Sequence, residues 1–91
     1  MKSRIHVVIA GRVQGVWFRA SIRDKAQQLG LKGWVKNIPG GDVEAVFDGE
    51  EKLVNEMVEW CHHGPPMAEV ENVKIKKEQS SNDFDDFLIK Y

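Results

Sequence analysis

Hydrophobic and polar positions follow two different periods along this chain, and each change of period marks a predicted element. Residues 4–11 (RIHVVIAG) are rich in β-branched side chains and end at a glycine, which predicts a largely buried strand. From Phe18 to Leu29 apolar residues recur three and four positions apart, which indicates an amphipathic helix. Gly30 follows, and glycine takes the left-handed conformation that ends a helix without strain.

A hairpin is predicted after this helix. LKGWVKNI (31–38) and DVEAVFDG (42–49) both have the composition of strands. Pro-Gly-Gly between them supplies the fixed φ and the positive φ that a turn requires. In the second strand Val43, Ala45 and Phe47 lie on one side, which gives the strand one apolar face.

A second helix is predicted between this hairpin and Gly64, which we expect to end it. Asp48 is expected to cap the helix, with Glu51 three residues on as its capping-box partner. The apolar stripe of this helix comprises Leu53, Val54, Met57, Val58, Trp60 and Cys61.

A strand around residues 68–77 (AEVENVKIKK) and a short strand within 84–91 (FDDFLIKY) complete the chain. The order β-α-β-β-α-β with a short fifth strand predicts the α+β class, with a ferredoxin-like split βαβ fold. We expect a single domain over residues 1–91, with one antiparallel sheet covered on one face by two helices. Because this fold hosts unrelated functions, its chemistry has to be sought in a site.

Composition limits the classes of partner. With 13 basic and 14 acidic residues the chain has a formal net charge of −1, which argues against a nucleic-acid binder. An RNA-recognition domain would need basic and aromatic residues on its central strands. The strand after the predicted turn instead carries Asp42, Glu44 and Asp48. We therefore expect no nucleic-acid partner.

The cysteine count and the length of the apolar runs indicate the compartment. Cys61 is the only cysteine, so no intramolecular disulfide is available, and a cytoplasmic location fits best. No apolar run approaches the roughly 20 residues that span a bilayer, so we expect no membrane association. The expected state is a monomer.

The stretch GRVQGVWFR (11–19) joins the first predicted strand to the first helix and has the features of an anion site. Unpaired backbone N–H groups gather at a helix N-terminus, and Gly15 allows the loop to curl around a ligand. The planar guanidinium of Arg19 can donate hydrogen bonds to two phosphate oxygens at once. The stretch is neither a Walker A loop nor a dinucleotide-binding loop. From these residues alone, a small-anion cradle and an ordinary strand-to-helix turn both remain open.

The same stretch resembles the first signature of the acylphosphatase family, and GWVKNIPGGDVEAVFDGE (33–50) resembles the second. GPPMAEVENV (64–73) and FLIKY (87–91) are also similar to family patterns, so the resemblance covers essentially the whole chain. It implies a ferredoxin-like fold and hydrolysis of an acyl phosphate to a carboxylate and inorganic phosphate. It implies no metal and no cofactor, with phosphate acting as product and competitive ligand.

The resemblance also implies roles for individual residues. Arg19 and Asn37 fall on the family's catalytic positions. The phosphate-binding positions of the family, which act through backbone N–H groups and the arginine side chain, fall on Gln14, Gly15, Val16, Trp17, Phe18 and Arg19.

This chemistry needs no strong acid or base, because an acyl phosphate already has a good leaving group. The charge of a loose phosphoryl transition state lies mainly on the phosphoryl oxygens, which suits preorganised donors. The amide of Asn37 does not titrate, so we expect it to orient the attacking water. The alternative is a domain of the same family type that binds anions without turnover.

Other residues receive less specific interpretations. We expect Arg23 to be a surface residue, and Trp17 and Phe18 to lie in the core or at its rim rather than to form an acyl-group pocket. Cys61 is expected to be a small buried hydrophobic residue, and His62 with His63 a poor metal pair. The acidic segment SSNDFDD (80–86) is expected to be a solvated loop.

Overall fold

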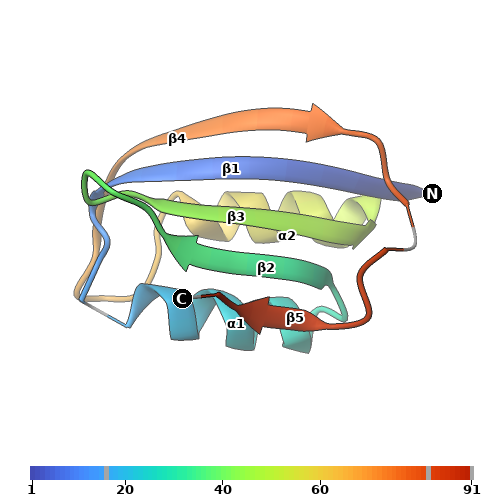
Figure 1. Ribbon diagram of the computed structural model, residues 1–91, viewed down its shortest axis with the longest axis horizontal. Helices are drawn as coiled ribbons and strands as arrows, with labels where there is room; N and C mark the ends of the chain where they lie inside the picture. Colours follow the sequence, from blue (N-terminus) through green and yellow to red (C-terminus); the bar gives the residue numbers. More distant parts are fainter. Residues whose placement is uncertain (16, 82, 91) are drawn as a thin grey trace.

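The computed structural model describes residues 1–15, 17–81 and 83–90, and within them five strands and two helices follow the predicted order (Figure 1). The elements are β1 (Lys2–Arg12), α1 (Phe18–Gln28), β2 (Lys32–Asn37), β3 (Val43–Glu50), α2 (Glu51–Cys61), β4 (Glu69–Glu78) and β5 (Phe87–Ile89). The β-α-β-β-α-β core is the predicted ferredoxin-like arrangement.

The five strands form one sheet in the order β4-β1-β3-β2-β5. β1 pairs with both β3 and β4 in antiparallel fashion, and β2 pairs antiparallel with β3. β5 lies parallel to β2, with Phe87 opposite Gly33. The expectation of a purely antiparallel sheet is therefore wrong at this edge. After β4 the chain passes around the end of the sheet where β1 begins and enters the far edge in the direction of β2 (Figure 1).

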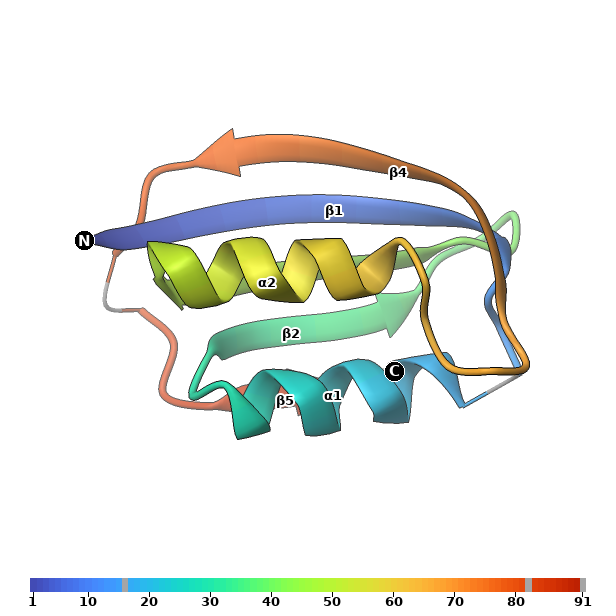
Figure 2. The ribbon, with the colours of Figure 1, turned by 180° about the vertical axis from the view of Figure 1, so that it is seen from behind.

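Both helices cover the same face of the sheet, as Figure 2 shows. The core between them is formed by fully buried side chains of α1, α2 and the helix-facing side of the strands: Val7, Ile9, Phe18, Ile22, Ala26, Val35, Ala45, Phe47, Val54, Met57, Cys61 and Phe87. The rings of Phe47 and Phe87 stack with centroids 5.6 Å apart, which fastens β5 to the core. Burying an aromatic or aliphatic side chain of this size stabilises the fold by about 1.5–3 kcal/mol.

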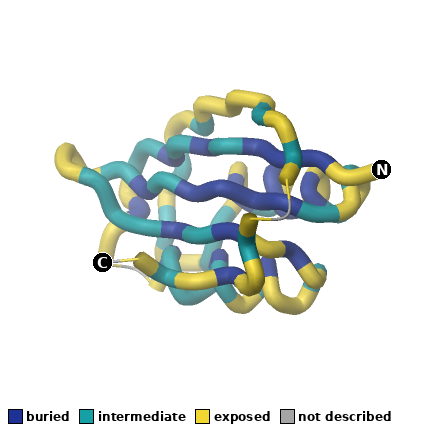
Figure 3. Tube along the Cα trace, turned by 45° about the vertical axis from the view of Figure 1, so that its right-hand side comes forward, coloured by how far each residue is buried: buried dark blue, intermediate teal, exposed yellow. Residues whose placement is uncertain are grey.

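Burial is concentrated in the central strands, whereas β4 is largely exposed (Figure 3). β4 forms one edge of the sheet and carries three lysines, Lys74, Lys76 and Lys77. Lysines on an edge strand discourage pairing with a second sheet.

Asp48 does not cap α2, contrary to the expectation from sequence. The N-cap residue is Glu50, which makes no side-chain capping bond, and the N–H of Glu51 donates to the carbonyl of Met1 at 2.9 Å. Asp48 instead accepts a hydrogen bond from Nε of Arg4 at 2.8 Å, with the two residues only 5% and 8% exposed. Because Asp48 lies opposite Arg4 in the register, its side chain projects from the sheet face away from the helices.

The segment between β4 and β5 is held by the same arginine and is not simply a solvated loop. Nη2 of Arg4 contacts the carboxylate of Asp83 and the hydroxyl of Ser81, and the guanidinium lies 4.4 Å from the ring centre of Phe84. The hydroxyl of Ser80 donates to Asp48 at 3.0 Å. A buried arginine that lost these acceptors would be strongly destabilising, so the cluster fixes the path of the chain into β5.

We expect Asp83→Asn to lower the melting temperature by several degrees at pH 7. Hydrogen bonds from Arg4 and then Ser81 lower the pKa of Asp83 from its ordinary value of 3.8 to about 2. Because the pKa of Asp83 is lowered in the folded state, the contribution of its carboxylate to the stability of the fold is fully present above pH 4 and is lost as the pH falls through 2. The melting temperatures of the wild type and the variant should therefore converge as the pH falls from 4 to 2. Asp85→Asn, on the same segment, is the control, and an equal loss in both variants would contradict the assignment.

Candidate active site

Two of the described residues between β1 and α1 have positive φ. Gly15 has φ 75°, and a Cβ built there would meet no atom within 4 Å. Trp17, the N-cap residue of α1, has φ 64° and is the one non-glycine residue with positive φ in the described chain. A left-handed conformation costs a non-glycine residue about 1–2 kcal/mol, and such strain is concentrated at functional sites.

Backbone donors are available at the N-terminus of α1. The N–H of Val13 donates to the carbonyl of Gly11 at 3.1 Å. Among the described residues, no carbonyl accepts a hydrogen bond from the backbone N–H of Gly15, Trp17 or Phe18. The positive end of the helix dipole adds to these donors, so the loop can receive an anion. Val16, which the sequence also places in the phosphate-binding set, lies outside the described residues.

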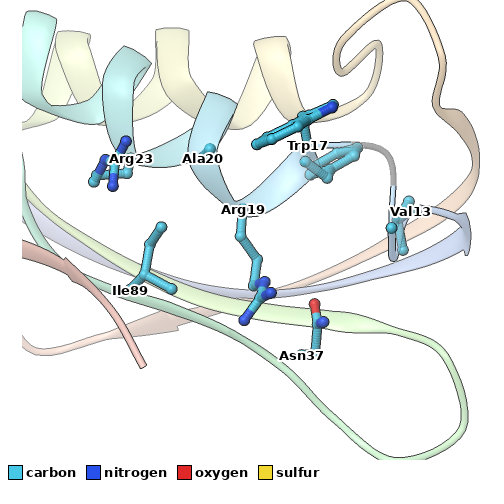
Figure 4. Close-up of a pocket in the computed structure, with 9 residues that line it drawn as sticks. Val13, Trp17, Arg19, Ala20, Arg23, Asn37 and Ile89 are labelled. Atoms are coloured by element: carbon cyan, nitrogen blue, oxygen red, sulfur yellow. The ribbon is translucent and has the colours of Figure 1, made fainter. Parts of the chain in front are cut away.

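A cavity of about 470 Å³ opens beside this loop and contains both residues expected to be catalytic. Arg19 reaches it from the first turn of α1, and Asn37 reaches it from the end of β2 (Figure 4). The side chains of Arg19 and Asn37 point toward each other across the cavity in Figure 4. Its described walls are Val13, Gly15, Trp17, Phe18, Arg19, Ala20, Arg23, Asn37 and Ile89.

The side-chain oxygen of Asn37 is buried, and no described residue donates a hydrogen bond to it. Leaving a buried acceptor unsatisfied costs about 1–3 kcal/mol, so a protein rarely retains one without a reason. The carboxamide lies at a cavity wall rather than inside the core. Because the oxygen itself is buried, we expect a molecule bound in the cavity to donate to it only after the carboxamide turns toward that molecule.

Gln14 does not line the cavity with its side chain. Its Nε2 donates to the carbonyl of Ile38 at 3.0 Å and to the carbonyl of Asp42 at 2.9 Å. These bonds join the β1–α1 loop to the β2–β3 turn that begins immediately after Asn37. The sequence suggested only the backbone of Gln14, because the partners of its side chain lie 24 and 28 positions away.

We expect Gln14→Ala to lower kcat about tenfold for an acyl phosphate, the substrate that the family resemblance implies. Without these bonds the β1–α1 loop and Asn37 would no longer be held in fixed relative positions, and small misplacements are costly in catalysis. The free energy of unfolding should fall by only about 1 kcal/mol, since the lost hydrogen bonds are exposed. Steady-state kinetics with thermal unfolding measures both. Gln27→Ala is a matched control, because Gln27 makes a comparable bond to the carbonyl of Phe87. An unchanged kcat in Gln14→Ala would contradict this role.

Arg23 is a surface residue as expected, with 40% of its side chain exposed, and it also forms part of the cavity wall. It follows Arg19 by four positions and therefore lies one helical turn further along the same face. That spacing was visible in the sequence. What the sequence did not show was that Ile89, from the parallel edge strand β5, would close this side of the cavity.

The two aromatic residues of the loop have different positions. Phe18 is buried and meets the ring of Trp60 edge-on, with centroids 6.0 Å apart. Trp17 is 80% exposed and lies at the rim of the cavity. Phe18 thus belongs to the core and Trp17 to the rim, as expected for the pair, although both also line the cavity.

The remaining polar candidates lie away from the cavity. Burial raises the pKa of the Cys61 thiol, and this side chain is part of the core as predicted. Nδ1 of His62 lies 3.0 Å from the carbonyl of Val58. Within residues 1–15, 17–81 and 83–90, no three His, Cys, Asp or Glu side chains converge in a way that could hold a metal ion. Neither helix of this part of the chain has the length and apolar run needed to cross a membrane.

Comparison with known proteins identifies relatives over nearly the full length. The acylphosphatase family model matches residues 5–89. The acylphosphatase of Geobacter sulfurreducens is 50% identical over 91 residues and covers 100% of both chains. That of Rubrobacter xylanophilus is 55% identical over 78 residues, covering 86% of this chain and 71% of its own. An acylphosphatase structure from Coxiella burnetii has a TM-score of 0.92 at 45% identity, covering 98% of this chain and 93% of that one.

Proposed function

The chain belongs to the acylphosphatase family, and we propose that it hydrolyses acyl phosphates to a carboxylate and inorganic phosphate. The observation that carries the proposal is the meeting of Arg19 and Asn37 in one cavity beside the β1–α1 loop. These residues come from different elements, α1 and β2.

The phosphoryl group binds between the loop and the guanidinium. The N–H groups of Gly15, Trp17 and Phe18 donate to its oxygens from the helix N-terminus, and Arg19 donates through two N–H groups at once. These donors are fixed by the fold before substrate arrives. They therefore stabilise the charge that spreads over the phosphoryl oxygens in a loose transition state.

Asn37 orients the attacking water. Once the carboxamide turns toward the cavity, its oxygen accepts a hydrogen bond from the water, which holds one lone pair of that water toward phosphorus and in line with the leaving carboxylate. This role is positional, because a carboxamide does not take up a proton at neutral pH. Inorganic phosphate then occupies the same cradle as product and as competitive inhibitor.

The composition of the cavity fits a substrate with a good leaving group. None of its described lining residues is a carboxylate, an imidazole or a thiol. The described residues of the site therefore offer electrostatic stabilisation and positioning, and none of their side chains is suited to general acid catalysis. An acyl phosphate, whose leaving group is a carboxylate, needs no such acid, whereas an alkyl phosphate ester does.

The experiment is phosphate release from benzoyl phosphate and acetyl phosphate in the presence of a chelator. We expect turnover of both, no dependence on added divalent metal, and no turnover of an alkyl phosphate. The second candidate, a domain that binds anions without turnover, predicts binding of inorganic phosphate without hydrolysis of either acyl phosphate. That result would overturn the enzymatic assignment.

The cysteine content bears on the compartment in which the protein acts. Cys61 is the only cysteine and is buried as a free thiol, which agrees with a reducing compartment, and we place the protein in the cytoplasm. We propose that residues 1–91 act as one domain and as a monomer, with no nucleic-acid partner. Size-exclusion chromatography with light scattering should give a mass near 10.4 kDa.

A further inference from the structure

We propose that Arg23 makes the enzyme selective for acyl phosphates whose acyl group carries a second anionic group. This inference rests on the proposed function and concerns the part of the cavity that the phosphoryl group does not fill. A water molecule occupies about 30 Å³ in the liquid, so a cavity of about 470 Å³ holds considerably more than a phosphoryl group and one attacking water.

The free part of the cavity extends along α1 away from the loop. Arg23 follows Arg19 by four positions in the helix, which corresponds to about 6 Å of axial rise. Figure 4 shows Ala20 on the helix between the two arginines and Ile89 facing them from β5. Trp17 lies at the rim. An acyl group leaving the phosphoryl site in this direction therefore meets small and apolar walls first and a guanidinium at the far end.

The guanidinium of Arg23 can exchange its present partner for a ligand. It contacts the carboxylate of Asp24 at 3.1 Å, and the two side chains are 40% and 69% exposed. Exposed ion pairs between neighbouring residues contribute little to stability, because water solvates both groups well. A carboxylate or phosphate at the far end of the substrate would compete effectively with Asp24 for Arg23. Binding of the phosphoryl group already holds the substrate in the cavity, so the second anion binds Arg23 at little further entropic cost.

The occupant is an acyl phosphate with an apolar or small spacer and a terminal anion. Arg23 would bind that anion through paired N–H donors, as guanidinium groups bind carboxylates and phosphates generally. A neutral acyl group of the same size would fit the same walls but would gain nothing from Arg23. The selectivity is thus a property of charge and not of volume.

The test compares 4-carboxybenzoyl phosphate with its methyl ester and with benzoyl phosphate, each rate being corrected for uncatalysed hydrolysis. The ester has the size of the acid without its charge. In the wild type we expect kcat/KM for the acid to exceed that for the ester by about five- to tenfold, which corresponds to one charge-assisted hydrogen-bonded contact. In Arg23→Ala and Arg23→Gln the ratio should fall to about one. High salt should lower the ratio in the wild type.

Asp24→Asn is the matched control, because it removes the competing carboxylate and leaves Arg23 in place. We expect this variant to raise the ratio of acid to ester. Hydrolysis of benzoyl phosphate with a wild-type ratio near one would overturn the role of Arg23 and leave the proposed function intact. If no acyl phosphate is hydrolysed, the proposed function fails. Calorimetry with the non-hydrolysable 4-carboxybenzoyl phosphonate and its methyl ester then still tests whether Arg23 selects for a second anionic group. Equal affinity of the two phosphonates would refute the selectivity.

Discussion

Replacing Arg19 by alanine should lower kcat/KM for benzoyl phosphate by about 10³-fold or more. Arg19 supplies a positive charge that lies on the cavity wall across from Asn37 (Figure 4). Loss of a preorganised donor to the transition state costs about 3–4 kcal/mol, and loss of a phosphate-binding arginine is at the upper end of such effects. Steady-state phosphate release, followed with and without added inorganic phosphate, measures the change in turnover and in phosphate affinity.

Arg19→Lys separates charge from geometry. Lysine keeps the positive charge but is a point donor that cannot bind two oxygens in a fork. We expect this variant to remain about 10²-fold below the wild type, because geometry as well as charge is required. Circular dichroism and thermal unfolding should show that both variants fold. Activity of Arg19→Ala within threefold of the wild type would refute the assignment of Arg19 to the phosphoryl group.

Replacing Asn37 by alanine should lower kcat by about 10²–10³-fold and leave the inhibition constant of inorganic phosphate within twofold of the wild type. The physical reason is that, in the mechanism proposed above, Asn37 holds the attacking water, whereas the loop and Arg19 hold the phosphoryl group. Phosphate inhibition of the residual activity, together with calorimetric titration of phosphate, checks this division. Equal losses of turnover and of phosphate affinity would contradict it.

The same substitution makes an independent prediction about stability. The buried oxygen of Asn37 accepts no hydrogen bond from a described residue, so its removal should raise the free energy of unfolding by about 1 kcal/mol. Asn37→Asp is the contrasting variant. It places a negative charge beside the phosphoryl site and should weaken phosphate binding as well as turnover. A gain in stability with a loss of turnover is the pattern expected where a site retains an unsatisfied group for function.

Much of the fold was predictable because its determinants are local. The change from a strand period to a helical period at Phe18 reports which side chains face the core, and α1 begins at that residue. Gly30 has φ 71°, the conformation that its position after the helix required. The hairpin of β2 and β3 was equally visible, since a turn with Pro and Gly fixes the antiparallel register of the strands on either side.

The candidate site was predictable in part for the same reason. Gly15 and Arg19 lie in one continuous stretch, so their proximity to the N-terminus of α1 follows from the chain itself. The role of Asn37 came from the resemblance of two separate stretches to one family and not from any local pattern. Its position in the same cavity as Arg19 is a property of the sheet order, which brings the end of β2 beside the loop that follows β1.

The sequence by itself thus determined the elements, the turns and the residues of the loop, because backbone preference and burial are encoded over a few neighbouring positions. Only the tertiary structure decided which distant groups meet. It directed Asp48 to Arg4 instead of to α2, placed β5 parallel to β2, and made Arg23 part of the cavity through Ile89. The partner of a polar side chain depends on the strands and helices that pack against its own, and no periodicity along the chain records that choice.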